Sequence, residues 1–371
     1  MKTNLFIKAL LAVSIALVAN SCSTVKYHVV TTVNRDGSFL REIYTSPDSL
    51  FLKGDRSRNP YLFKIDSNWQ ISEVENTINM HPESGFSNRK YKSLTKISSR
   101  FTSFENYASQ LQYSENLRPM AAPAESLARQ FRWFYTYYTF NAVYSSVSER
   151  IPVNIDEFMS SDGQLMWFRD GYLNQFFAGM TGLEAKDALD EFEKNTLEWY
   201  YRNTFEISFA AIEKYAGEIS SNPYASILSE IKDTLFTASS GTAKAKNDET
   251  GYSAQYVCQL IDEYLKTDFF STVYRTNGKE IDKLSEDMWN PVNDLLDKEI
   301  NCELIMPGAV LASNATFCSG DTLGWKIDFY RLIPGNYTLS AQSRSANVWA
   351  FAATLLLAAV AVYCLVRLIG R

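Results

Sequence analysis

The pattern of apolar and polar residues changes twice along the chain, which divides it into β-rich ends and a helical middle. Residues 22–150 and 302–346 hold short runs of alternating polarity, and Asp36 with Gly37 supplies a tight hairpin turn. In residues 151–301 the apolar positions recur every three or four residues, as in helices. We therefore predict an α+β fold, with an antiparallel β-sheet from the N- and C-terminal segments and a large helical insertion, for which a separate helical domain is the alternative.

The most aromatic segment, residues 131–140, predicts one central strand with rings on both faces. Trp133, Tyr135 and Tyr137 share one face of this strand, and Trp167 lies on a predicted helix of the insertion. These four residues are candidates for stacking against a ligand such as a glycan or a peptide. Burial in the core is the alternative, because aromatic side chains dominate protein cores as well as binding sites.

An apolar segment near the C-terminus predicts a transmembrane helix over residues 347–369. Residues 348–366 carry no charged side chain, and this length is enough to cross the hydrocarbon core of a bilayer. Arg367 and Arg371 follow the apolar run, which predicts that this end of the helix faces the cytoplasm. Cleavage of the segment as a C-terminal sorting signal is the alternative, but no sorting motif precedes Trp349.

Residues 1–21 predict a signal peptide of the kind found in bacterial lipoproteins. Lys2 and Lys8 accompany an apolar stretch that is too short to span a membrane and that leads into Cys22. The sequence thus predicts cleavage after Ser21 and lipidation of Cys22 with palmitate or a similar acyl chain. Ordinary cleavage without lipidation is the alternative.

The two anchors together predict where the protein resides. A lipidated Cys22 and a helix over residues 347–369 would hold the folded domain on the periplasmic side of the inner (cell) membrane. A carrier that handles lipid tails cannot extract a transmembrane helix, so display on the cell surface is not expected. The residues after Cys22 also lack the acidic pair that resembles a surface-export signal in Bacteroidetes-type lipoproteins.

Charge and cysteine content narrow the partners further. The net charge is −6 over 371 residues and no block of five like charges occurs, so nucleic acid is not expected as a partner. Between the anchors lie Cys258, Cys302 and Cys318, in a compartment that permits disulfides. Cys302 and Cys318 flank a predicted strand pair and are candidates for a disulfide, with two buried free thiols as the alternative.

Few residues offer catalytic chemistry. The two histidines, His28 and His81, lie in no metal-binding frame, and no glycine-rich nucleotide motif occurs, so neither a metal nor a cofactor is predicted. A glycan hydrolase needs only two carboxylates, which composition cannot exclude. Asp170, beside aromatic residues and Arg169, is the acid of most interest, and an ordinary ion pair is its alternative.

Several short motifs resemble the LppM-type domain of bacterial envelope lipoproteins. The N-terminal turn after the signal peptide and the terminal apolar helix are similar to that family, as are the following residues of the C-terminal segment: Pro307, Gly308, Asn314, Gly320, Trp325, Ala341, Gln342 and Ser343. The resemblance covers a minor part of the chain and departs from the family at the helical insertion. It implies an α+β envelope module with a ligand- or lipid-related role, and it supplies no catalytic residues.

The leading functional hypothesis is a non-enzymatic envelope lipoprotein that binds or scaffolds a partner outside the inner membrane. The absence of catalytic motifs from the sequence favours it. Expected partners are the membrane itself and an envelope protein, a lipid or a glycan. The alternative is a carboxylate-dependent hydrolase that acts on cell-wall glycan.

Overall fold

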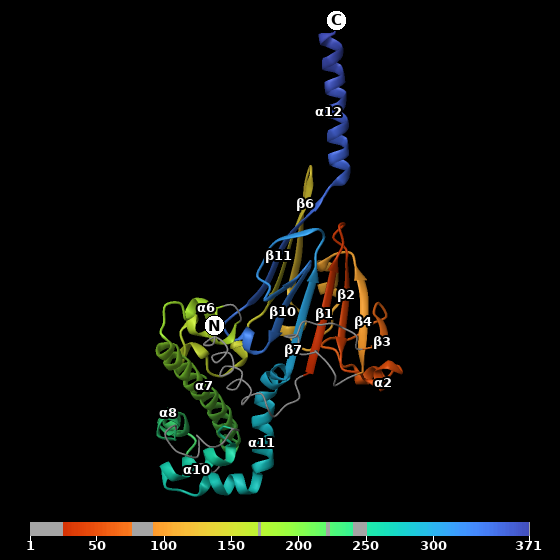
Figure 1. Cartoon of the computed structure of the whole chain (residues 1–371). Helices are drawn as coiled ribbons and strands as arrows, with labels where there is room; N and C mark the ends of the chain where they lie inside the picture. The colour runs from red at the N-terminus through yellow and green to blue at the C-terminus, as the bar shows by residue number, and fades with distance from the viewer. Residues whose placement is uncertain (1–24, 76–91, 170–171, 220–222, 240–250, 371) are drawn as a thin grey trace. The chain divides into compact units, whose positions relative to one another are not determined.

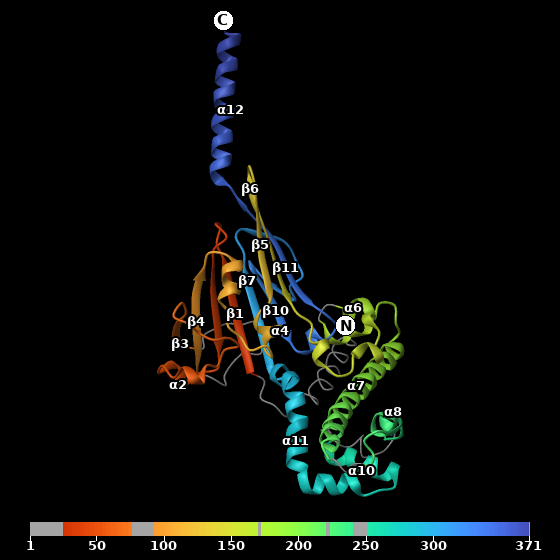
Figure 2. The same ribbon diagram turned by 180° about the vertical axis from the view of Figure 1, so that it is seen from behind.

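The computed structural model is a mixed α+β structure with two compact units, which confirms the predicted fold class (Figures 1 and 2). The sheet unit consists of Thr24–Ser145, Lys298–Asp328 and Asn336–Arg371, and the helical unit consists of Ser146–Asp297 and Phe329–Gly335. The structure describes residues 25–75, 92–169, 172–219, 223–239 and 251–370. Cys22, His81 and Asp170 lie outside these described residues.

Seven strands from both ends of the chain form the larger sheet: β1 (Val25–Val33), β2 (Phe39–Thr45), β3 (Gln70–Glu75), β4 (Ser93–Phe101), β7 (Lys298–Ile305), β9 (Phe317–Ser319) and β10 (Thr322–Asp328). Their order is β3-β4-β2-β1-β7-β10-β9. β1 and β2 form the predicted hairpin, and Gly37 in its turn has the positive φ of 95° that glycine adopts without strain. β7 pairs with β1 in parallel, and the other neighbours are antiparallel.

Four strands form the second sheet: β5 (Ala124–Arg132), β6 (Tyr135–Tyr144), β8 (Ala309–Ser313) and β11 (Tyr337–Ala346). All pairs in its order, β5-β6-β11-β8, are antiparallel. The prediction of one strand over residues 131–140 is wrong, because the chain reverses at Trp133 and Phe134 and pairs Arg132 with Tyr135. This turn contains neither glycine nor asparagine, so its residues gave no turn signal.

Aromatic rings fill the space between the two sheets. The Phe39 ring of β2 stacks on Phe104 of α3 (Phe104–Gln110) with centroids 4.1 Å apart, and Phe104 contacts Phe140 of β6 at 5.4 Å. All three side chains are buried. Burial of such large apolar rings contributes strongly to stability and fixes the sheets against each other. Two short helices, α2 (Ser49–Leu52) and α4 (Arg118–Ala121), complete this unit together with its terminal helix.

The helical unit is built around a long helix, α7 (Gly182–Gly217), which begins with a capping box. The Thr181 hydroxyl accepts from the Glu184 backbone N–H, and the Glu184 carboxylate accepts from the Thr181 backbone N–H. Apolar residues of this helix, among them Phe205 and Phe209, join a core that includes Ile261. The helices are α5 (Ser161–Phe168), α6 (Leu173–Phe176), α7 (Gly182–Gly217), α8 (Leu228–Ser239), α10 (Ala254–Leu265) and α11 (Phe269–Leu296).

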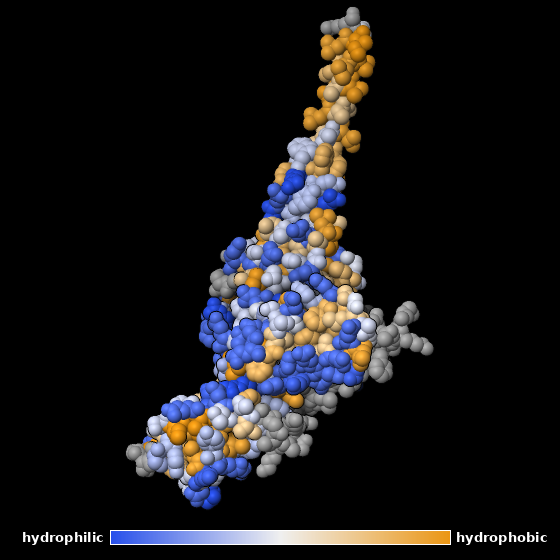
Figure 3. Space-filling view, turned by 90° about the vertical axis from the view of Figure 1, so that its left-hand side faces the viewer, coloured by the Kyte–Doolittle hydropathy of each residue, from blue (hydrophilic) through white to orange (hydrophobic). Residues whose placement is uncertain are grey.

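One described helix, α12 (Val348–Ile369), is long and apolar enough to cross a membrane. None of the apolar window that defines it is buried against the protein, and Figure 3 shows most of its surface in orange and pale orange. It follows β11 after a single intervening residue, Asn347. The structure therefore contains the C-terminal candidate span that the apolar run predicted.

Candidate functional site

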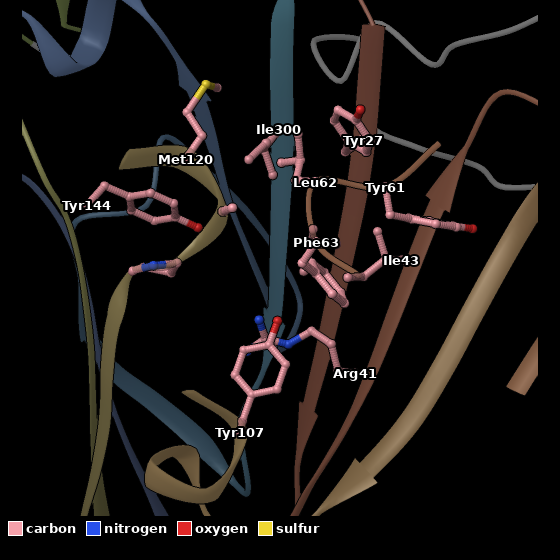
Figure 4. A pocket seen from close by; sticks show the side chains of 13 residues that line it. Tyr27, Arg41, Ile43, Tyr61, Leu62, Phe63, Tyr107, Met120, Tyr144 and Ile300 are labelled. Carbon is pink, nitrogen blue, oxygen red and sulfur yellow. The ribbon is translucent and has the colours of Figure 1, made fainter. Parts of the chain in front are cut away.

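The interior of the sheet unit contains a narrow recess whose volume of about 30 Å³ leaves room for little more than a water molecule (Figure 4). Strands β1, β2, β6 and β7 line it together with α3, α4 and residues 61–63. Its wall is mostly apolar and aromatic, and it consists of Tyr27, Val29, Arg41, Ile43, Tyr61, Leu62, Phe63, Tyr107, Met120, Ala121, Pro123, Tyr144 and Ile300.

A buried ion pair lies at the edge of this recess and joins the two sheets. The guanidinium Nη2 of Arg41 on β2 donates to both carboxylate oxygens of Glu125 on β5, at 2.9 and 3.0 Å. Both side chains are only 5% exposed. Burial alone would lower the pKa of Arg41, but the Glu125 carboxylate raises it above its ordinary value, so the Arg41 guanidinium stays charged.

Aromatic and thiol groups surround the same pair and remain protonated. The Tyr107 ring lies 4.5 Å from the Arg41 guanidinium carbon, and Figure 4 shows the arginine reaching toward that ring. Burial raises the pKa of Tyr107 to about 12, and it raises the pKa of the Cys302 thiol to about 11. The Tyr144 hydroxyl lies 3.4 Å from the Cys302 sulfur. At neutral pH the cluster therefore offers neither a thiolate nor a phenolate nucleophile.

The other buried carboxylates also have partners. Glu299 on β7 pairs with Lys326 at 2.9 Å and with Lys26 at 3.6 Å. Asp262 accepts from the backbone N–H groups of Phe270 and Ser271 at 3.0 and 2.7 Å, where α11 begins. A pair of buried acids without counter-charges, which the hydrolase alternative requires, is not found among the described residues, and neither is a metal-binding group of three.

The outer face of the four-stranded sheet presents a second, wider site. A shallow groove of about 300 Å³ is lined by Thr139, Asn141, Ala312, Ser313, Asn314, Ser340, Ala341 and Gln342. Asn314 shapes its floor, because its side-chain oxygen accepts from the Trp325 indole at 3.0 Å and from the Ser340 backbone at 2.8 Å. The bond between the Trp325 indole and Asn314 thus joins two residues of the motif that resembles the LppM-type domain.

Half-buried tyrosines continue this face toward the turn between β5 and β6. Tyr135 and Tyr137 alternate along β6 with buried residues. The Arg344 guanidinium lies 4.7 Å from the Tyr135 ring, and the Arg132 guanidinium lies 5.1 Å from the Tyr137 ring. Arginine over an aromatic face is a stable cation–π arrangement and leaves the guanidinium edge free to bind anions or hydroxyl groups.

The candidate stacking residues divide between the two units. Trp133, Tyr135 and Tyr137 belong to one end of the second sheet, where Trp133 is 45% exposed in the turn. Trp167 belongs to α5 of the helical unit and contacts the Phe192 ring at 6.0 Å. The structure thus brings three of the four candidates together, and ligand stacking by any of them stays a prediction.

The two cysteines proposed as a disulfide lie on strands that flank β10. Cys302 on β7 pairs with Trp325, and Cys318 on β9 pairs with Leu323. Both cysteines are free thiols in this structure. They sit on opposite sides of one strand, about two strand spacings apart, which is farther than a disulfide normally bridges.

Sequence reasoning missed the buried ion pair. Arg41 and Glu125 are 84 positions apart, and each lies in a segment of ordinary alternating polarity. Inward-facing charges in two strands would have been the signal, but only if the facing partner strands had already been known. A buried charge requires a partner, so each residue alone predicts that another exists without identifying it.

Comparisons with known proteins leave the family open. No family model matches the sequence, and no curated protein matches it. Among solved structures, the chain is similar to the NMR structure of the folded domain of LppM from Mycobacterium tuberculosis, with 8% sequence identity and a TM-score of 0.28. The match covers 88% of this chain and 92% of that domain. At this identity and TM-score we draw no conclusion about function from it.

Proposed function

We propose that the chain is a non-enzymatic, membrane-anchored envelope lipoprotein whose sheet unit binds or scaffolds a partner at the periplasmic face of the inner membrane. The observation that carries the proposal is α12, which packs against the protein only at its first turns and leaves an apolar surface exposed over a length that suits a bilayer. A soluble domain would bury such a helix. Lipidation at Cys22 would add the second anchor.

The direct connection between sheet and helix supports a scaffolding role. Asn347 alone separates β11 from α12, and its side chain and backbone bond to the neighbouring turn of β5 and β6. Such a junction, with no flexible linker, sets the distance between the groove on the outer face of the sheet and the membrane. A partner bound in that groove would be held at a fixed height above the lipid.

The chemistry of the interior supports binding over catalysis. The buried acids are engaged by Arg41, by two lysines or by backbone N–H groups, and burial keeps the Cys302 thiol protonated. The outer groove instead offers hydroxyl and amide groups beside two tyrosines, a combination that suits a glycan, a lipid headgroup or a peptide. No observation favours the hydrolase alternative, and we do not propose it.

Intact-protein mass spectrometry of separated inner and outer membranes tests the proposal. We expect the mature chain in the inner membrane, with an acylated Cys22 at its N-terminus and Arg371 retained. A Cys22→Ser variant should lose the acyl mass but stay membrane-bound through α12. A trimmed C-terminus together with an unmodified N-terminus would contradict the proposal, because neither anchor would then exist.

A further inference from the structure

The turn between β5 and β6 lies against the first turns of α12, and aromatic side chains of the two segments contact one another. Phe131 stacks on Trp349 with centroids 6.2 Å apart, Trp133 meets Trp349 edge-on at 5.3 Å, and Phe134 contacts Phe351 at 4.7 Å. We call these five residues the aromatic collar. Both views in Figures 1 and 2 show the tip of β6 beside the start of α12.

The collar stays open to solvent although its members touch one another. The exposed fractions are 54% for Phe131, 45% for Trp133, 38% for Phe134, 56% for Trp349 and 39% for Phe351. A cluster of large exposed rings indicates a surface that another phase or molecule covers. Here the cluster is continuous with α12, and tryptophan is the residue that bilayer interfaces favour at the ends of spanning helices.

The backbone of the turn is already prepared for a medium of low polarity. The Asn347 side-chain amide donates to the carbonyl oxygens of Arg132 and Trp133, at 2.9 and 3.1 Å, and the Asn347 backbone N–H donates to Phe134 at 2.9 Å. The Trp133 indole N–H donates to the Thr354 hydroxyl at 2.8 Å. Three successive carbonyls thus need no water, which lowers the cost of placing the turn next to lipid.

The charges next to the collar are positive. Arg132 and Arg344 are exposed, and their guanidinium groups lie over the rings of Tyr137 and Tyr135, next to the collar. The sequence has no acidic residue between Glu125 and Glu149, or after Asp328. Aromatic rings with arginines beside them, at the end of an apolar helix, suit the boundary between the acyl chains and the phosphates of one leaflet.

We propose that the aromatic collar lies at the boundary between headgroups and acyl chains of the bilayer that α12 crosses. The turn of β5 and β6 is then a second membrane contact beside the helix, and it fixes the tilt of the sheet unit. The inference rests on the proposed function, because it requires α12 to span the membrane. The inference adds a membrane contact made by the β5–β6 hairpin. A spanning helix does not by itself require such a contact.

Quenching of tryptophan fluorescence by brominated phosphatidylcholine tests the collar in the full chain reconstituted into vesicles. Of the seven tryptophans, Trp133 and Trp349 should be quenched by bromine near the headgroup end of the acyl chain, and more weakly by bromine near its methyl end. Trp133→Phe and Trp349→Phe should each remove part of the quenched signal. Trp69→Phe, which removes a buried indole of the sheet unit away from the collar, should leave the quenched signal unchanged.

The variants separate the two proposals. If Trp349→Phe lowers the quenched signal and Trp133→Phe does not, α12 enters the bilayer but the turn stays in water, and the collar inference is wrong. If the unmodified chain shows no quenching by either lipid, α12 does not enter the bilayer, and both proposals fail. Loss of quenched signal in both variants supports the collar at the lipid boundary.

Discussion

The sheet unit holds two clusters of aromatic rings and arginines whose surroundings are opposite. In the interior cluster, Arg41 is enclosed by Glu125 and by the Tyr107 ring, and both charged side chains are 5% exposed. In the collar region, Arg132 and the Trp133 ring remain open to solvent. Similar residues therefore serve two purposes: an ion pair closes the interior, whereas the arginines at the edge are exposed and can meet an external anion.

The largest expected effect of a substitution is at the buried ion pair of the interior cluster. Glu125→Ala leaves the Arg41 guanidinium buried without a counter-charge, so we expect the free energy of unfolding to fall by about 3–5 kcal/mol. Urea unfolding of the full chain in detergent measures this change. Glu115→Ala, which breaks an exposed pair with Arg118, should leave the unfolding free energy nearly unchanged. Equal losses in the two variants would contradict the buried pair.

The next largest effect is expected in α12. Leu356→Arg places a charge in the middle of the apolar run and should oppose membrane insertion by about 2.5–3.5 kcal/mol. Extraction with alkaline carbonate, in a Cys22→Ser background that lacks the lipid, should then release much of the protein. Leu368→Arg, beside Arg367 at the end of the helix, is the matched control and should stay in the pellet. Retention of both variants would argue against a spanning α12.

The Cys302 thiol of the interior cluster should also react slowly with alkylating reagents. The pKa of Cys302 rises from 9.0 to about 11, so at pH 8 its thiolate fraction, and with it the rate of alkylation, should be about a hundredfold lower than in the unfolded chain. The exposed Cys318 provides an internal reference. Peptide mass spectrometry after timed exposure to iodoacetamide measures both rates. Equal rates for Cys302 before and after unfolding in urea would show that the thiol is accessible and unperturbed.

The smallest effect is expected at the turn. Phe134→Ser removes a ring that is 38% exposed, and the free energy of unfolding in detergent should change by less than about 1 kcal/mol. Phe140→Ala, on the same hairpin but 3% exposed, should cost about 3–5 kcal/mol. A loss at Phe134 as large as that at Phe140 would make the turn part of the core and remove the contrast between the clusters.

The fold class could be predicted from the sequence because each period of the hydrophobic pattern reports local geometry. The alternation around Asp36 and Gly37 predicted the β1–β2 hairpin, and the apolar run predicted a terminal helix that the structure contains as α12. Both signals depend only on neighbouring residues. The same alternation failed at Trp133, because a two-residue turn made of aromatic residues carries no local mark and the polarity pattern continues through it.

The sites were harder to predict because they depend on contacts between distant segments. The parallel pairing of β1 with β7 brings residues 25–33 beside residues 298–305, and no local pattern specifies that pairing. The hydrogen bond from Asn347 to the Trp133 carbonyl likewise joins residues more than two hundred positions apart. Trp133, Tyr135 and Tyr137 were found as candidates by their chemistry, whereas Arg41 and Glu125 could be recognised only once the two sheets had been placed face to face.

The proposed topology is tested most directly by labelling Cys318, a native exposed thiol in the sheet unit. Intact spheroplasts are treated with a membrane-impermeant maleimide, and the purified protein is then digested and analysed by mass spectrometry. A sheet unit on the periplasmic face predicts full labelling of Cys318 before lysis. Labelling that appears only after the spheroplasts are lysed would place the sheet unit in the cytoplasm and contradict the membrane-anchored envelope module.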